Sequence, residues 1–159
     1  MKSVTFLIVS LIICLPAFGK NLCEYDDKIV FSCEVGTKNI SVCLTSTGSV
    51  KYLFGTRDNI ERQLSSPIFS SAACSGGAVS RVRFKTGNTS YVVYDVMCNS
   101  YRINDTLWSK SESAGVMVLN GDKVQVKTVC TDFDDSLFGI NTALLPSTIE
   151  KEDFDHELP

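Results

Sequence analysis

The sequence predicts an all-β domain, a small antiparallel sandwich or barrel stapled by disulfides, with an acidic C-terminal extension. Three observations predict this fold class. Apolar and polar residues alternate in short runs, and turns containing glycine separate these runs. Helical periodicity is poor between residues 20 and 130, and an even number of cysteines follows the first nineteen residues. The length of 159 residues suits one domain with a buried core.

The first half of this domain contains three alternating runs, each of which we expect to be a strand. Residues 29–35 and 40–44 alternate on either side of Gly36, which predicts a hairpin. A third run, residues 50–54, follows a turn at Gly48.

The second half predicts four further strands. Residues 79–85 alternate, whereas residues 90–97 are apolar on both faces and therefore suit a central strand. Asn120-Gly121 is the strongest hairpin signal in the chain and joins residues 115–119 to residues 123–129. About seven short strands in total indicate a sandwich or a small barrel.

The first nineteen residues predict a cleaved signal peptide. Lys2 precedes an apolar run over residues 4–15, and small residues stand at the −3 and −1 positions of a cut after Gly19. We therefore expect a periplasmic or secreted protein without a transmembrane anchor. Acylation at Cys14 is an alternative, but a lipoprotein signal needs a small residue before the cysteine, where this chain has Ile13.

Export also determines how the cysteines are interpreted. Because the compartment is oxidising, an even set predicts structural disulfides, with fifteen pairings open. No two cysteines have a CxxC spacing, so a redox pair or a zinc knuckle has no support. The six disulfide candidates are Cys23, Cys33, Cys43, Cys74, Cys98 and Cys130.

Alternation argues against pairing Cys33 with Cys43. A two-residue turn at Thr37-Lys38 places Cys33 opposite Val42, and the two cysteines then lie on opposite faces of the hairpin. A disulfide needs Cβ atoms about 3.5–4.5 Å apart, which opposite faces do not allow. Each cysteine is therefore expected to bond a different, more distant one, unless a one-residue bulge near Gly36 realigns the strands.

Charge divides the mature chain into two parts. Residues 20–130 carry thirteen basic and ten acidic side chains, a balance of +3, whereas residues 131–159 carry eight acidic side chains and one basic one. We therefore predict a disulfide-bonded β domain over residues 20–130 and an acidic extension over residues 131–159. The extension has a candidate ordered piece at residues 137–145, and its removal is expected to leave the domain folded.

Several short motifs resemble a family of small, mostly uncharacterised exported proteins of proteobacteria. They are Lys28-Ile-Val-Phe-Ser-Cys33, Ile40-Ser-Val-Cys43, Tyr52-Leu-Phe-Gly55, Val82-Arg-Phe-Lys-Thr-Gly87, Tyr91-Val-Val-Tyr94 and Gly115-Val-Met-Val-Leu119. The similarity covers about residues 23–132. It implies a periplasmic β-rich domain and supplies no activity.

A second, weaker resemblance is to the periplasmic inhibitors of C-type lysozyme. Trp108-Ser-Lys110 with Ala114 and Cys130 is similar to their W-x-K-G-x-x-A segment, with Ser111 in place of the glycine. The Ser-Gly-x-x-Tyr stretch that carries inhibition in those proteins has no match here. The resemblance implies that Trp108 and Lys110 are partner-binding candidates; the alternative is that Trp108 packs at a sheet edge.

Catalytic and metal sites find little support. The single histidine, His156, excludes a site with two imidazoles, and no Ser-His or Cys-His pair can be built around it in a polar tail. The acidic residues that begin at Asp132 fail as a calcium loop, because Leu137 and Ala143 stand where Gly and Glu are needed. We therefore expect no enzyme, no cofactor and no metal.

A basic stripe formed by Arg81, Arg83 and Lys85 shares one strand face, and Lys110 is expected near it. Three ligands are compatible with such a stripe: polyanionic envelope material, an acidic partner, or the protein's own tail. The alternative is a hydrated sheet face that discourages aggregation.

The hypothesis that follows is a non-catalytic periplasmic protein that binds another protein of the cell envelope, as an inhibitor or as an immunity factor against an envelope-acting toxin or lysozyme. A structural or envelope-maintenance protein with no tight partner is the first alternative. A hydrolase with an unrecognised carboxylate site, such as Asp26-Asp27, is the second. The net charge of −3 gives no support to nucleic-acid binding, and the oligomeric state stays open.

Overall fold

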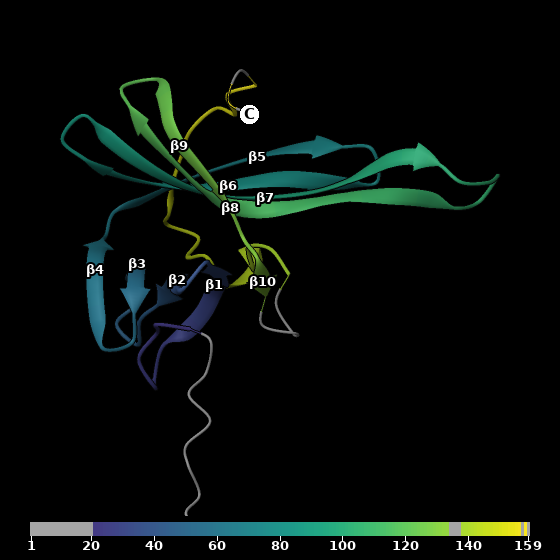
Figure 1. Ribbon diagram of the computed structural model, residues 1–159. Helices are drawn as coiled ribbons and strands as arrows, with labels where there is room; N and C mark the ends of the chain where they lie inside the picture. The colour runs from purple at the N-terminus through teal and green to yellow at the C-terminus, as the bar shows by residue number, and fades with distance from the viewer. Residues whose placement is uncertain (1–20, 134–137, 157, 159) are drawn as a thin grey trace, which may run out of the picture.

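Residues 21–133, 138–156 and 158 are described by the computed structural model, and they form two packed β-sheets (Figure 1). Their one helical element is a 3-10 turn, η1 (Thr142–Leu144). The predicted all-β sandwich held by disulfides is confirmed. The signal peptide predicted at residues 1–19, and the alternative of acylation at Cys14, lie outside the described residues.

The first sheet has five antiparallel strands in the order β10-β1-β2-β3-β4. Short turns connect β1 to β4 in sequence, as the alternating runs predict for the first three of them. The strands are β1 (Lys28–Val35), β2 (Lys38–Leu44), β3 (Val50–Thr56), β4 (Asn59–Leu64) and β10 (Asp132–Phe133).

The second sheet has six strands in the order β11-β5-β6-β7-β8-β9, and only the β11–β5 pair is parallel. Its strands run across those of the first sheet (Figure 1). The strands are β5 (Pro67–Cys74), β6 (Gly77–Thr86), β7 (Thr89–Arg102), β8 (Trp108–Asn120), β9 (Lys123–Val129) and β11 (Glu150–Lys151).

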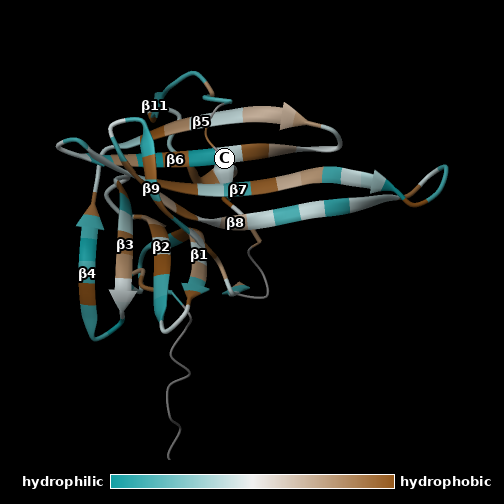
Figure 2. Ribbon diagram, turned by 45° about the horizontal axis from the view of Figure 1, so that its top comes forward, coloured by the Kyte–Doolittle hydropathy of each residue, from teal (hydrophilic) through white to brown (hydrophobic). Residues whose placement is uncertain are grey.

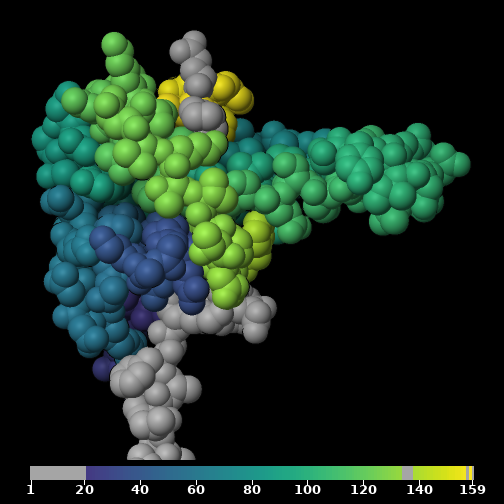
Figure 3. All heavy atoms as spheres, in the orientation of Figure 1, coloured from purple at the N-terminus to yellow at the C-terminus, as the bar shows by residue number. Residues whose placement is uncertain are grey.

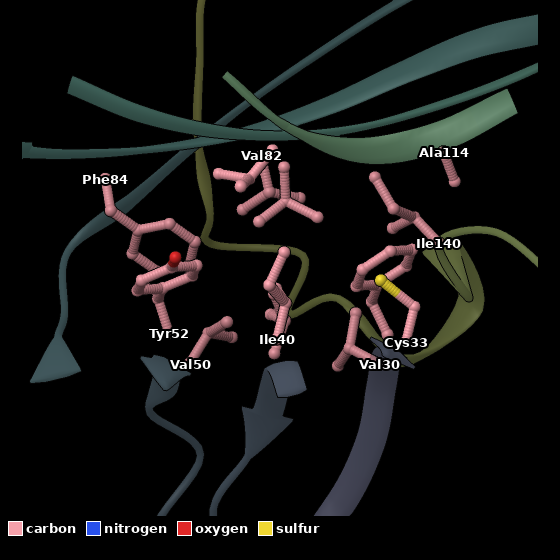
Figure 4. Packing of buried hydrophobic residues seen from close by; sticks show 13 residues of the cluster. Val30, Cys33, Ile40, Val50, Tyr52, Val82, Phe84, Ala114 and Ile140 are labelled. Atoms are coloured by element: carbon pink, nitrogen blue, oxygen red, sulfur yellow. The ribbon is translucent and has the colours of Figure 1, made fainter. Parts of the chain in front are cut away.

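The core lies between the two sheets. Hydrophobic and hydrophilic residues alternate along the strands (Figure 2), so each sheet turns one apolar face inward. Ile40 and Tyr52 of the first sheet point toward Val82, Phe84 and their neighbours in the second (Figure 4). These four side chains are at most 2% exposed, and burial of such side chains is the main favourable term for the sandwich.

The β1–β2 hairpin confirms the predicted faces and corrects the predicted register. The turn is at Gly36-Thr37, one residue earlier than expected, and Cys33 therefore lies opposite Ile40 and not opposite Val42. Gly36 has a φ of +63°, a conformation that glycine adopts at little cost, and this preference fixes the position of the turn. Because the register differs by two residues, residues 31–35 and 40–44 keep their predicted faces. A bulge between Ile29 and Phe31 reverses the start of β1, so Ile29 lies on the outer face and Val30 lies in the core.

The disulfides confirm that all six predicted cysteines are bonded. Cys33 and Cys43 each bond a more distant cysteine, as the argument from faces predicts. The Cys33 bond closes the largest loop, with a sequence separation of 97, and ties β1 of the first sheet to the end of β9 in the second. The pairs are Cys23–Cys43, Cys33–Cys130 and Cys74–Cys98.

An N-terminal segment, residues 21–27, lies against the outer face of the first sheet. The backbone N–H of Leu22 donates a hydrogen bond of 3.0 Å to the hydroxyl oxygen of Ser41, and Cys23 is bonded to Cys43. Leu22 and Leu53 form a small apolar cluster with these cysteines. The segment therefore covers apolar surface that the first sheet turns away from the core.

The prediction of a separate acidic extension over residues 131–159 is not confirmed, because the described residues after Cys130 pack on both sheets. Strand β10 pairs with β1, and β11 pairs with β5. Ile140 is 8% exposed within the core, and Leu158 is 8% exposed on the outer face of the second sheet. Charge balance was misleading here because the apolar side chains that anchor the segment are interspersed among the acidic ones.

Candidate functional site

Strands β7 and β8 extend beyond the rest of the second sheet and form a projecting two-stranded arm (Figures 1 and 3). They are the longest strands of the described chain, with 14 and 13 residues. Strand β6 pairs with β7 only as far as Met97, and β9 pairs with β8 only from Gly115. Residues 98–111, which we call the arm, therefore have no other strand beside them.

The root of the arm is fixed to the turn between β5 and β6. The Cys74–Cys98 disulfide crosses this junction with its Cα atoms 5.8 Å apart. Beside it, the backbone N–H of Asn99 donates to the Ser75 carbonyl at 2.7 Å, and the Lys110 ammonium donates to the Gly76 carbonyl at 2.8 Å. These bonds hold the two strands in one direction relative to the body.

The tip of the arm satisfies its own backbone groups. Asn104 Oδ1 accepts hydrogen bonds from the backbone N–H groups of Thr106 and Leu107, at 3.0 and 2.9 Å. The Arg102 guanidinium donates to the carbonyl oxygens of Asn104 and Asp105 and pairs with the Asp105 carboxylate at 3.1 Å. The turn is therefore formed before any partner arrives, and its two charges neutralise each other.

Four large apolar side chains are exposed on this tip. Among the described residues, eight large hydrophobic side chains are exposed, and four of these eight lie within residues 101–108. Such a concentration of exposed apolar side chains is typical of an interaction site. The four, with their exposed fractions, are Tyr101 (64%), Ile103 (53%), Leu107 (52%) and Trp108 (43%).

The sequence identified Trp108 and Lys110 as partner-binding candidates and did not identify the other three tip residues. The structure places Trp108 opposite Arg102, on the same tip as Tyr101, Ile103 and Leu107, and places Lys110 at the root of the arm. A signal was present, since a polar Asn-Asp-Thr turn separates two short apolar pairs.

The basic stripe is held by the protein's own C-terminal segment. Arg81 is only 4% exposed, and its guanidinium donates to the carbonyl oxygens of Asp155 and Leu158 at 2.6 and 2.8 Å. It also lies 4.1 Å from the centre of the Phe154 ring, which is a cation–π distance. Burial lowers the pKa of Arg81, whereas the nearby Asp155 carboxylate raises it.

The second arginine of the stripe also contacts this segment. Arg83 forms an ion pair of 2.8 Å with Glu152. Of the three ligands considered for the stripe, the observed contacts are therefore those with its own tail. Lys110 does not join the stripe, because it lies on the face of β8 that carries Ala114 and faces the core.

A carboxyl group is buried between the sheets. The Asp95 carboxyl is 9% exposed, and its Oδ1 atom has no hydrogen-bond partner. Burial raises the pKa of Asp95, although hydrogen bonds from Ile140 and Ser80 act in the opposite direction. In the described parts of the chain no three His, Cys, Asp or Glu side chains gather as metal ligands would, and His156 lies beside the Phe154 ring.

The fold and this arm define the protein as a disulfide-bonded β-sandwich with a projecting apolar hairpin. No protein-family model, curated protein or solved structure matches the chain. In its described residues no helix has the length and apolar character needed to cross a membrane.

Proposed function

We propose that this protein is a non-catalytic, exported binding protein that contacts another protein of the cell envelope with the tip of its arm. The observation that carries the proposal is the cluster of four exposed apolar side chains on a hairpin whose polar groups are bonded internally. Three disulfides and a sequence with the features of a signal peptide are compatible with export to the periplasm or beyond.

The composition of the tip supports protein recognition. Tryptophan and tyrosine are enriched among the few residues that dominate binding energy, and here they flank two aliphatic side chains. Because the turn is preformed and the root is fixed by Cys74–Cys98, binding would immobilise few additional groups.

The shape of the arm favours a partner with a concave surface. A two-stranded ribbon is narrow enough to enter a cleft that the body of the sandwich cannot enter (Figure 3). Inhibition of an envelope-acting enzyme, or immunity against a toxin, is the role that such an insertion would serve.

Site-specific photocrosslinking in the producing cell tests this proposal. A photoreactive amino acid at Ile103 or Leu107 is expected to yield one discrete crosslinked species. The matched control is Ile60 on β4, which is also an exposed isoleucine, 40% exposed, but lies away from the arm. Equal crosslinking from all three positions, or none from the arm, would contradict the proposal and favour a structural protein with no tight partner.

A further inference from the structure

A groove opens between the two sheets on the side where β9 forms the edge of the second sheet. Val35 and Phe54 of the first sheet form one wall, and Val118 and Val126 of the second sheet form the other. Its volume is about 240 Å³, and nearly all of its lining is apolar. The groove is separate from the arm and from the basic stripe.

The groove exists because the inter-sheet space is filled unevenly. Elsewhere, the segment after β10 inserts Ile140, Leu144 and Leu145 against the core. In the described chain no such segment covers the groove, and Val126 is left 51% exposed at its mouth. Exposed apolar surface of this kind is a site that a ligand would stabilise.

Two cations lie beside aromatic rings that line the groove. Lys38 is opposite Val35 and Arg62 is opposite Phe54, so the register places both on the inner face of the first sheet. Lys38 lies 5.3 Å from the Phe54 ring centre and is paired with Glu61 at 2.8 Å.

Arg62 has a different environment. Its guanidinium lies 5.8 Å from the centre of the Tyr91 ring, and it forms no ion pair with any carboxylate of the described chain. The charge of Arg62 also acts on Tyr52, which lines the groove. Burial raises the pKa of Tyr52 above its ordinary range, and the nearby Arg62 guanidinium opposes this by lowering it. The groove therefore combines apolar walls with a nearby cation that no carboxylate of the described residues pairs with.

We propose that this groove binds an anionic amphiphile, a medium-length alkyl chain ending in a carboxylate. The carboxylate pairs with Arg62, and the chain lies between Val35, Phe54, Val118 and Val126. Arginine matches the geometry of a carboxylate with two parallel hydrogen bonds. A volume just below the range of about 300–1,000 Å³ for drug-sized ligands fits one such chain and not a sterol or a phospholipid.

Calorimetric titration of the exported protein with three ten-carbon probes tests the head group. Decanoate, decanol and decyltrimethylammonium are compared below their micelle-forming concentrations. Decanoate is expected to bind one per chain and at least tenfold more tightly than the cationic probe. Arg62→Gln is expected to weaken decanoate about fivefold or more and to leave decanol unchanged.

A matched pair of variants on β9 tests the location. Val126→Phe fills the groove from an exposed position, whereas Val129 is 52% exposed on the same strand and does not line it. Val126→Phe is expected to lower decanoate affinity at least tenfold, and Val129→Phe to leave it unchanged.

Three results would overturn the assignment: no binding of decanoate by protein with native circular dichroism, equal affinity for the anionic and cationic probes, or equal loss in the two β9 variants. Sedimentation that shows a dimer abolished by Val126→Phe, but not by Val129→Phe, would also overturn it, because the occupant would then be a second copy of the chain.

Discussion

The tip of the arm and the basic stripe differ in which of their groups they leave facing solvent. At the tip, the charged groups of Arg102 and Asp105 are bonded to each other and to the turn, and the apolar side chains are exposed. On the stripe, Arg81 and Arg83 are bonded to the C-terminal segment, and Leu158 covers the apolar residues beside them.

It follows that a run of charged residues in a sequence does not by itself identify a surface that is available to a partner. The stripe has the higher density of charge, but the C-terminal segment of the same chain pairs with its arginines and covers the apolar residues beside them. The tip has almost no net charge, but it exposes apolar surface to water. Binding of a partner would remove this surface from water, which is favourable. Four changes to the chain test this conclusion.

The largest effect is expected from removing the C-terminal segment. A chain that ends after Asp132 loses β11 and the buried side chains of Ile140 and Leu158. Because large buried aliphatic side chains each stabilise by about 2–5 kcal/mol, the loss is expected to exceed about 4 kcal/mol. Thermal unfolding followed by circular dichroism measures it; an unchanged melting temperature would restore the interpretation of this segment as a separate extension.

The next effect isolates the stripe. Arg81→Met removes two hydrogen bonds from a charged donor to the segment and is expected to destabilise the fold by about 2–3 kcal/mol. Lys85→Met, on the same face but with no hydrogen bond or ion pair to the described residues of the segment, is the matched control and is expected to change stability by less than about 0.5 kcal/mol. Hydrogen exchange should become faster within residues 150–156 only in the Arg81 variant. Equal effects of both substitutions would mean that stability depends on the total charge of the stripe and not on its contacts with the C-terminal segment.

A third change concerns Asp95, whose buried carboxyl has one oxygen atom, Oδ1, without a hydrogen-bond partner. Because burial raises the pKa of Asp95, folding favours its protonated form. Its contribution to stability is therefore complete below the ordinary aspartate pKa of about 4 and is lost as pH rises through the raised value.

Asp95→Asn is expected to remove this loss of stability at higher pH, because an amide does not ionise. The variant should gain stability relative to the native protein between pH 4 and pH 7, and the difference should vanish near pH 3. Urea unfolding at a series of pH values measures it. A difference that is constant with pH would show that Asp95 carries no charge-dependent cost.

The faces of the strands could be predicted because they depend on a local period of two residues. The register of the first hairpin could not, since it depends on Gly36 adopting a positive φ. Strand β4 escaped prediction because five of its six residues are exposed and no apolar face marks it. The bond between Cys33 and Cys130 depends on how the two sheets pack, which spacing alone does not determine.

The candidate site shows the same limit. Trp108 was identified from a short motif, but Tyr101 and Ile103 were not, because residues 98–102 were not recognised as the end of a strand that Ile103 directly follows. A ribbon exposed on both faces has no amphipathic alternation, and this pattern was the main evidence used to find strands. Likewise, the groove depends on three-dimensional contacts between Val35 of β1, Phe54 of β3 and Val126 of β9.

The smallest effect on stability is expected at the tip itself. Ile103→Ser combined with Leu107→Ser removes side chains that are already half exposed, and the backbone bond from the Ile103 N–H to the Leu107 carbonyl, 2.9 Å long, does not depend on them. The free energy of unfolding should therefore change by less than about 1 kcal/mol. Trp108 is the only tryptophan, so its fluorescence reports the tip directly and should keep the emission maximum of an exposed indole. Photocrosslinking from position 101 should nevertheless be lost, because the apolar cluster has been removed while the hairpin remains. If the double substitution unfolds the protein, the tip contributes to the stability of the sandwich. The arm would then not be a free interaction surface.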